Sequence, residues 1–165
     1  GEGAVLLQNR VLPLAEGTKV SVFGRVQVNH FYTGYGSGGD VNIPYTVSIY
    51  EGLKNCPGVK LDDALAEKYR AFCEDNPVED QVWGLWPRFF PEMPLTEEIL
   101  DGVSADQAVI VIGRSAGEDR ENVRKPGSFY LTEEEKHMLA LIEEALQQGA
   151  AGTGRQIGSL IIFVI

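Results

Sequence analysis

Two uninterrupted apolar segments limit the class of fold that this chain can adopt. Residues 108–112 (AVIVI), within a predicted strand over 106–113, and residues 160–165 (LIIFVI) contain no polar side chain. Strands with this composition are apolar on both faces, which is typical of a parallel sheet covered by helices on both sides. Residues 19–24 (KVSVFG) predict a third strand, because β-branched and aromatic residues precede a glycine. We therefore expect one largely parallel sheet.

The clearest predicted helix spans residues 132–148. Thr132 and Glu135 have the spacing of a capping box, and glutamates fill the first turn, where the helix dipole favours negative charge. Gly149 is the predicted end of this helix. Its apolar residues recur at helical spacing and predict one buried stripe, formed by Met138, Leu139, Ile142 and Leu146.

Weaker helical patterns cover residues 45–55 and 61–74. Helices that alternate with apolar strands predict an α/β domain, here a three-layer α/β sandwich with a largely parallel sheet. We expect the domain to span residues 1–165, with a leading segment over 1–18. The apolar strand at 160–165 predicts further neighbours, so we expect the domain to be incomplete at Ile165 and the chain to be part of a longer polypeptide.

Charge and composition exclude some partners. The 165 residues carry 14 Lys and Arg against 24 Asp and Glu, a formal net charge of −10. Nucleic acids and anionic membranes are poor partners for such a chain, because binding to either depends on clustered basic residues. Cys56 and Cys73 predict two ordinary thiols, which favours a cytoplasmic protein. The sequence leaves oligomerisation open.

Residues 76–98 form a long segment rich in proline and aromatic side chains. Its four prolines argue against a regular element, and the aromatic side chains are too apolar for a free linker: Trp83, Trp86, Phe89 and Phe90. One interpretation is a loop whose aromatic residues fill a satellite core, and the other is an aromatic wall beside a ligand cleft. The first is favoured, because buried aromatic residues are commoner than sugar platforms.

Two loop motifs could carry chemistry. Residues 34–39 (GYGSGG) lack the glycine spacing of a dinucleotide site, so a ligand-facing loop and a purely structural one remain about equally supported. Residues 113–117 (GRSAG) match the G-x-S-x-G elbow of serine hydrolases, with Ser115 as the nucleophile. The charged residues that follow and the position of His137 inside a predicted helix weaken this interpretation.

The same loop also contains carboxylates. Glu118, Asp119 and Glu121 follow the carboxyl end of a predicted parallel strand, which is where ligands bind in open α/β sheets. A buried carboxylic acid there could act as a glycosidase acid. On composition alone, a solvated loop with weak surface ion pairs is the favoured alternative.

Several segments together resemble the α/β-sandwich domain of glycoside hydrolase family 3, the β-glucosidase type. They occur in the family's order over most of the chain, up to about residue 148. These segments are 3–14 (GAVLLQNRVLPL), 19–25 (KVSVFGR), 34–39 (GYGSGG), 108–122 (AVIVIGRSAGEDREN) and 131–135 (LTEEE).

The resemblance implies a function and site residues. Members of the family are retaining hydrolases of terminal β-linked glucose that need no metal or cofactor, with a β-glucoside or oligosaccharide as substrate. A TIM-like barrel of the same polypeptide, absent from this chain, would supply the aspartate nucleophile, so the chain alone is expected to be inactive. By the family's motif Glu118 is the acid/base, Ser37 contacts the sugar, and Asp119 and Arg120 order the loop. Glu121 is the reserve candidate, because this loop is shorter than the family's pattern.

Two other functions remain open at this point. One is a serine hydrolase that uses Ser115, and the other is a non-catalytic α/β module that binds a small ligand through residues 34–39.

Overall fold

A computed structural model describes residues 3–30, 42–78, 90–114, 122–151 and 157–164. Within them, four parallel strands form one sheet in the order β2-β1-β3-β4. The register pairs Val22 with Val109, and Val109 with Ile161. The predicted α/β class with a parallel sheet is therefore confirmed. The strands are β1 (Thr18–Phe23), β2 (Val59–Leu61), β3 (Ala105–Ile112) and β4 (Ile157–Val164).

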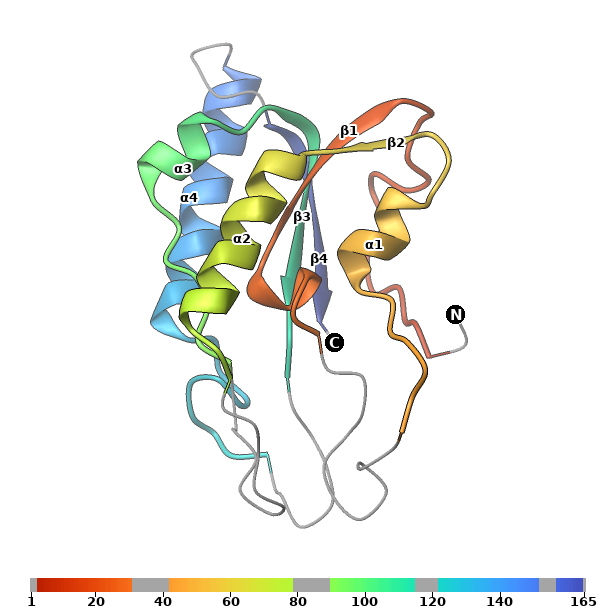
Figure 1. Ribbon diagram of the computed structural model, residues 1–165. Coiled ribbons are helices and arrows are strands. Elements are labelled where there is room, and N and C mark those ends of the chain that lie inside the picture. The colour runs from red at the N-terminus through yellow and green to blue at the C-terminus, as the bar shows by residue number, and fades with distance from the viewer. Residues whose placement is uncertain (1–2, 31–41, 79–89, 115–121, 152–156, 165) are drawn as a thin grey trace.

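Helices cover both faces of the sheet, as the sandwich prediction requires. On one face lie α2 (Asp63–Asp75), α3 (Glu97–Asp101) and α4 (Glu133–Ala150), and on the other lies α1 (Ile49–Lys54) (Figure 1). The larger core fills the first side and contains Phe23, Ile110 and Ile142 among its buried residues. The smaller core on the second side is mainly valine from β1 and β3.

The capping box at the start of α4 is confirmed. The Thr132 hydroxyl accepts the Glu135 N–H at 3.1 Å, and the Glu135 carboxylate accepts the Thr132 N–H at 2.8 Å. The helix ends at Ala150, so Gly149 does not end it as predicted. The buried stripe is also rotated from the predicted one, with Leu139 and Leu146 only partly buried. It consists of Glu135, Met138, Leu141, Ile142 and Ala145.

Helix α1 is shorter than its predicted range of 45–55. It begins after Ser48, whose hydroxyl accepts the Glu51 N–H at 3.1 Å while the Glu51 carboxylate accepts the Ser48 N–H at 2.9 Å. This second capping box fixes where the helix starts, and it explains why the residues before Ser48 are not helical.

The prediction that residues 76–98 contain no regular element is wrong at their end. Thr96 caps α3, accepting the Ile99 N–H at 3.3 Å. Met93 and Leu95, from the same segment, are buried in the larger core. Trp83, Trp86 and Phe89 lie outside the described residues, so their roles remain predictions.

Strand β4 begins at Ile157, three residues before the predicted strand. Two of its apolar side chains, Ile162 and Val164, are 50% and 67% exposed, although the sequence predicts cover on both faces. Cys56 and Cys73 are free thiols. In the described part of the chain, no helix has the length and apolar character needed to cross a membrane.

Candidate functional site

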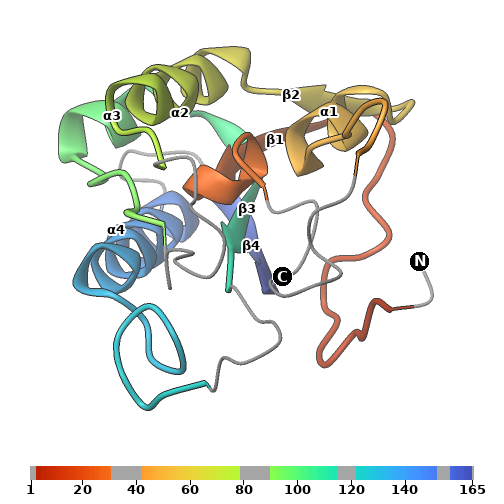
Figure 2. The same ribbon diagram turned by 60° about the horizontal axis from the view of Figure 1, so that its bottom comes forward.

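The carboxyl ends of β1, β3 and β4 lie at one edge of the sheet, because these strands pair in parallel (Figures 1 and 2). The last turn of α2 and the first turn of α4 lie at the same edge (Figure 1). Ligands bind at this edge in open α/β sheets. We therefore take the carboxyl edge as the candidate site.

Every catalytic or sugar-binding residue predicted from the sequence falls in a segment outside the described residues. Ser37 belongs to 31–41, and Glu118, Asp119, Arg120 and Glu121 belong to 115–121. Their roles remain predictions. The described residues that flank these segments show how the chain is fixed on either side of them.

Arg114 lies two residues beyond β3 and immediately before residues 115–121. Its two terminal nitrogens donate to the two carboxylate oxygens of Glu135, each at 2.7 Å. One of them also donates to the Gly113 carbonyl at 2.7 Å, and the other to the Tyr130 carbonyl at 3.4 Å. The side chains of Arg114 and Glu135 are only 18% and 8% exposed. This is a bidentate, largely buried ion pair, the strong form of the arginine–carboxylate contact.

The end of β1 is built around a glycine and a buried arginine. Gly24 has a φ of 97°, and a Cβ atom added to it would lie 2.1 Å from the Val111 carbonyl oxygen on β3. Only glycine combines this backbone conformation with so close an approach. The chain then turns into the short 3-10 helix η1 (Arg25–Gln27).

The Arg25 side chain is 1% exposed and connects three separate segments. Its guanidinium donates to the Asn29 side chain at 3.2 Å, the Asn76 carbonyl at 2.8 Å and the Pro91 carbonyl at 2.9 Å. Asn29 precedes residues 31–41, while Asn76 and Pro91 flank residues 79–89. Arg25 therefore fixes the described ends of both segments.

Aromatic rings complete the surroundings of Arg25. The guanidinium carbon lies 5.7 Å from the centre of the Phe72 ring and 5.5 Å from that of Phe90. Both distances suit cation–π contacts. Burial lowers the pKa of Arg25, although an arginine stays charged in proteins.

Glu92 is a partly buried carboxylate of the same cluster. Its two oxygens accept the Arg25 N–H at 3.0 and 2.9 Å, and one also accepts the Met93 N–H at 2.8 Å. Burial raises the pKa of Glu92 to about 7, against the opposing effect of these N–H donors, and the charge of Glu135 adds to the rise. Perturbed carboxylates of this kind cluster at functional sites.

Sequence reasoning missed Arg25, Glu92 and the pairing of Arg114 with Glu135. Arg25 stands in the segment 19–25 that carries the family resemblance, but no role was predicted for it. A charged residue directly after a buried strand and its glycine is the signal that could have identified Arg25 and, after 106–113, Arg114.

The described residues do not support the serine-hydrolase alternative. His137 is exposed on α4, and residues 122–131 contain no helix, whereas the residues directly after Ser115, where an elbow needs its helix, are not described. Ser115 itself lies outside the described residues. Within the described ranges, no three His, Cys, Asp or Glu side chains group so that they could hold a metal ion.

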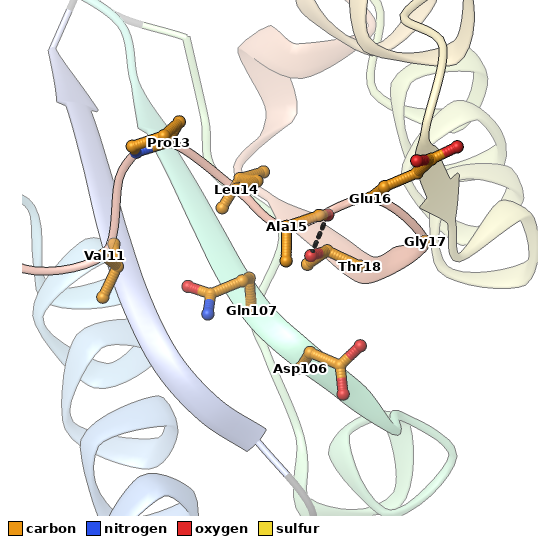
Figure 3. A pocket seen from close by; sticks show the side chains of 9 residues that line it. All are labelled: Val11, Pro13, Leu14, Ala15, Glu16, Gly17, Thr18, Asp106 and Gln107. Carbon is orange, nitrogen blue, oxygen red and sulfur yellow. Dashed lines mark hydrogen bonds between the residues drawn. The ribbon is translucent and has the colours of Figure 1, made fainter.

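A cavity of about 460 Å³ lies at the opposite edge, where β1 and β3 begin (Figure 3). Three of the polar side chains that line it, those of Thr18, Asp106 and Gln107, bind their own neighbours. The Thr18 hydroxyl donates to the Ala15 carbonyl at 2.6 Å, the Asp106 carboxylate accepts the Lys19 N–H at 2.8 Å, and the side-chain oxygen of Gln107 accepts the Ser159 hydroxyl. The carboxyl edge thus remains the better candidate site.

Comparisons with known proteins find β-glucosidases that are similar to this chain. The chain is 38% identical over 147 residues to a β-glucosidase of Ruminococcus albus, covering 87% of this chain and 15% of that protein. It is 33% identical to β-glucosidase A of Butyrivibrio fibrisolvens, covering 87% of this chain and 20% of that protein. The chain therefore spans about one fifth or less of the length of these curated relatives.

Solved structures share the fold. A β-glucosidase from Paenibacillus barengoltzii matches with a TM-score of 0.77 and 34% identity, over 95% of this chain and 16% of that one. β-Glucosidase 3B from Thermotoga neapolitana in complex with α-D-glucose matches with a TM-score of 0.75 and 29% identity, over 97% and 22% of the two chains. The glycosyl hydrolase family 3 C-terminal domain matches residues 4–151. Because this match covers most of the length of the chain, the chain belongs to glycoside hydrolase family 3, as a C-terminal domain of that family.

Proposed function

We propose that this domain supplies the general acid/base and part of the sugar-binding site of a retaining β-glucosidase. The complete enzyme would hydrolyse terminal β-D-glucosyl residues, with an aspartate nucleophile supplied by a TIM-like barrel of the same polypeptide. The family match over residues 4–151 carries the proposal, because it includes the GRSAGEDREN segment that follows β3. The relatives named above are β-glucosidases, and one of their structures holds glucose.

Glu118 is the proposed acid/base. A retaining glycosidase needs two carboxyl groups about 5–5.5 Å apart. One attacks the anomeric carbon and forms a glycosyl-enzyme, while the other donates its proton to the departing glycosidic oxygen. The second group then takes a proton from the water that hydrolyses the intermediate, so it acts first as an acid and then as a base.

The change of role follows from electrostatics. Before the first step the ionised nucleophile and burial both raise the pKa of the acid and keep it protonated. Formation of the glycosyl-enzyme removes the charge of the nucleophile, so the pKa of Glu118 falls and it can act as the base. Ser37 is proposed to contact the sugar, and Asp119 and Arg120 to order the segment around Glu118. Glu121 is the reserve candidate for the acid/base.

The test is Glu118→Gln in the full-length protein, with Glu121→Gln as the matched variant. Glu118→Gln should lower kcat/KM on cellobiose by a factor of about 10²–10⁴, because the glucose leaving group needs protonation. Attack on 2,4-dinitrophenyl β-glucoside should be nearly unchanged, because dinitrophenolate leaves without a proton. Glu121→Gln should leave both rates near the parental values.

Two outcomes would change the assignment. If Glu118→Gln hydrolyses cellobiose at the parental rate, Glu118 is not the acid/base. If Glu121→Gln instead shows the selective loss on cellobiose, Glu121 takes the role. The isolated chain should hydrolyse neither substrate, because the nucleophile belongs to the barrel.

A further inference from the structure

We propose that Arg114 and Glu135 are positioning residues for the acid/base. Their ion pair would fix the point from which residues 115–121 leave the sheet, and so hold Glu118 within reach of the glycosidic oxygen. This inference rests on the proposed function and adds to it a pair that does not itself touch the substrate.

The position of Arg114 in the chain is the first reason. Strand β3 is anchored in the core, with Ile110 and Val111 fully buried, and it ends at Ile112. Arg114 is therefore the last residue before the 115–121 segment, and Glu118 follows it by four positions. Whatever fixes the direction of the chain at Arg114 also limits where Glu118 can lie.

The strength of the contact is the second reason. Exposed ion pairs contribute little, because water screens them and long side chains lose freedom. The Arg114–Glu135 pair is different, since both of its N–O distances are 2.7 Å and its side chains are 18% and 8% exposed. Two parallel hydrogen bonds also fix the orientation of the guanidinium, which a single contact would not do.

The rigidity of the partner is the third reason. Glu135 lies in the first turn of α4, where its carboxylate also accepts the Thr132 N–H at 2.8 Å and its own N–H donates to the Thr132 hydroxyl at 3.1 Å. Met138 and Ile142, on the same face of the helix, are fully buried. Arg114 is thus attached to a helix that the core holds in place.

The residues after the segment are anchored as well. The Val123 N–H donates to the Ser128 hydroxyl at 3.1 Å, and the Tyr130 N–H donates to the Lys125 carbonyl at 3.1 Å. The Tyr130 carbonyl in turn accepts a hydrogen bond from Arg114 at 3.4 Å. Arg114 therefore contacts the chain on both sides of 115–121, which would set the distance between the two ends of that segment.

Misplacement of an acid has a specific kinetic signature. A shift of about 1 Å in a reacting group can cost about 10²-fold in rate. The rate falls only for a substrate whose leaving group needs a proton. It should therefore fall for cellobiose and stay nearly unchanged for 2,4-dinitrophenyl β-glucoside. A variant that only destabilised the fold would lower the rates on both substrates in proportion to the amount of folded enzyme.

The experiment uses the full-length protein with Arg114→Gln, Glu135→Gln and the double variant. Each single variant should lower kcat/KM on cellobiose by about 10–100-fold and that on 2,4-dinitrophenyl β-glucoside by less than about threefold. The double variant should lose no more than the worse single variant, because both act through one contact. Arg114→Lys should hydrolyse cellobiose faster than Arg114→Gln but more slowly than the parent, since it keeps the charge but loses the bidentate geometry.

The matched control is an exposed ion pair on the same helix. Lys136 and Glu133 lie 2.7 Å apart with side chains 51% and 80% exposed. Lys136→Gln and Glu133→Gln should leave both kcat/KM values unchanged. These variants remove the same types of charge from the first turn of α4 without touching Arg114.

The outcomes separate this inference from the proposed function. Equal losses on both substrates, or no loss on either, would overturn the positioning role while Glu118→Gln still showed its selective effect. If Glu118→Gln keeps the parental cellobiose rate, the acid/base assignment fails first and the inference falls with it. Should Arg114→Gln fail to fold, Glu135→Gln gives the same readout, because glutamine keeps the size and shape of the glutamate side chain.

Discussion

Arg25 and Arg114 each follow a buried strand at the same edge of the sheet, but their guanidinium groups are satisfied in different ways. Arg25 is almost completely buried, donates to an amide side chain and two backbone carbonyls, and contacts two aromatic rings. Arg114 retains some exposure and pairs with one carboxylate on one helix, besides its hydrogen bonds to the Gly113 and Tyr130 carbonyls.

This difference predicts a division of roles. Gly24, Arg25 and Glu92, here called the β1 cluster, join segments that are distant in sequence, so they should matter most for stability. Arg114 and Glu135, here called the β3 pair, join one strand end to one helix next to the proposed acid/base segment. The β3 pair should therefore matter less for stability and more for the rate of the acid-dependent step.

The largest expected effect is Arg25→Met, which tests the β1 cluster directly. It removes hydrogen bonds to the Asn76 and Pro91 carbonyls and the polar contacts of a side chain that is only 1% exposed, so the free energy of unfolding should fall by about 3–5 kcal/mol. Urea unfolding measures this loss. Arg124→Met, at an exposed position, should change it by less than about 0.5 kcal/mol. A loss below about 1 kcal/mol for Arg25→Met would show that the β1 cluster does not matter most for stability.

Gly24→Ala should have the next largest effect. The new methyl group would meet the Val111 carbonyl oxygen at 2.1 Å in a backbone with a φ of 97°. Strain and overpacking together should cost about 3 kcal/mol. Gly17→Ala is the matched control, because its φ is also positive, at 83°, but nothing lies within 4 Å of the added atom. That control should cost about 1 kcal/mol in the same urea experiment, and equal losses for the two variants would refute the close-approach argument.

The third prediction concerns Glu92 and pH. Its pKa is about 7 in the folded protein and near its ordinary value of 4.5 when unfolded, so between these values only the folded state holds the proton. Within the range from pH 5 to pH 8, the free energy of unfolding should therefore be greatest at pH 5 and should fall by about 2–3 kcal/mol by pH 8. Glu92→Gln should remove this fall, because the neutral amide does not titrate.

Unfolding by urea at pH 5 and pH 8 checks the prediction. The two proteins should have similar stability at pH 5, and the variant should be the more stable one at pH 8. An identical pH dependence for the parent and Glu92→Gln would show that another group is responsible.

The smallest stability effect belongs to the β3 pair. Arg114→Gln should lower the free energy of unfolding by about 1–2 kcal/mol, because the Glu135 carboxylate keeps the Thr132 N–H and the helix N-terminus as partners. Lys136→Gln, from the exposed pair, should change it by less than about 0.5 kcal/mol. A loss for Arg114→Gln as large as that for Arg25→Met would remove the proposed division of roles.

The long elements of this fold were predictable from local pattern. Apolar runs located β1 and β3 to within a residue, and the capping box located the start of α4. Helix α3 and strand β2 were missed because periodicity needs more residues than their five and three provide.

The anchors of the candidate site were not predictable in the same way. Arg25 and Glu92 meet across 67 positions of sequence, and Arg114 and Glu135 across 21, so no local pattern pairs them. The proposed catalytic and sugar-binding roles came instead from the order of family motifs, at positions outside the described residues.

The most direct test of the central proposal is to identify the product that Glu118→Gln forms in azide. Azide needs no general base, so it should intercept the glycosyl-enzyme formed by the full-length variant from 2,4-dinitrophenyl β-glucoside. NMR should then detect β-glucosyl azide and faster turnover, whereas the parent should release glucose alone. Release of glucose by the variant at the parental rate, with no azide adduct, would contradict the role of this domain as the source of the acid/base.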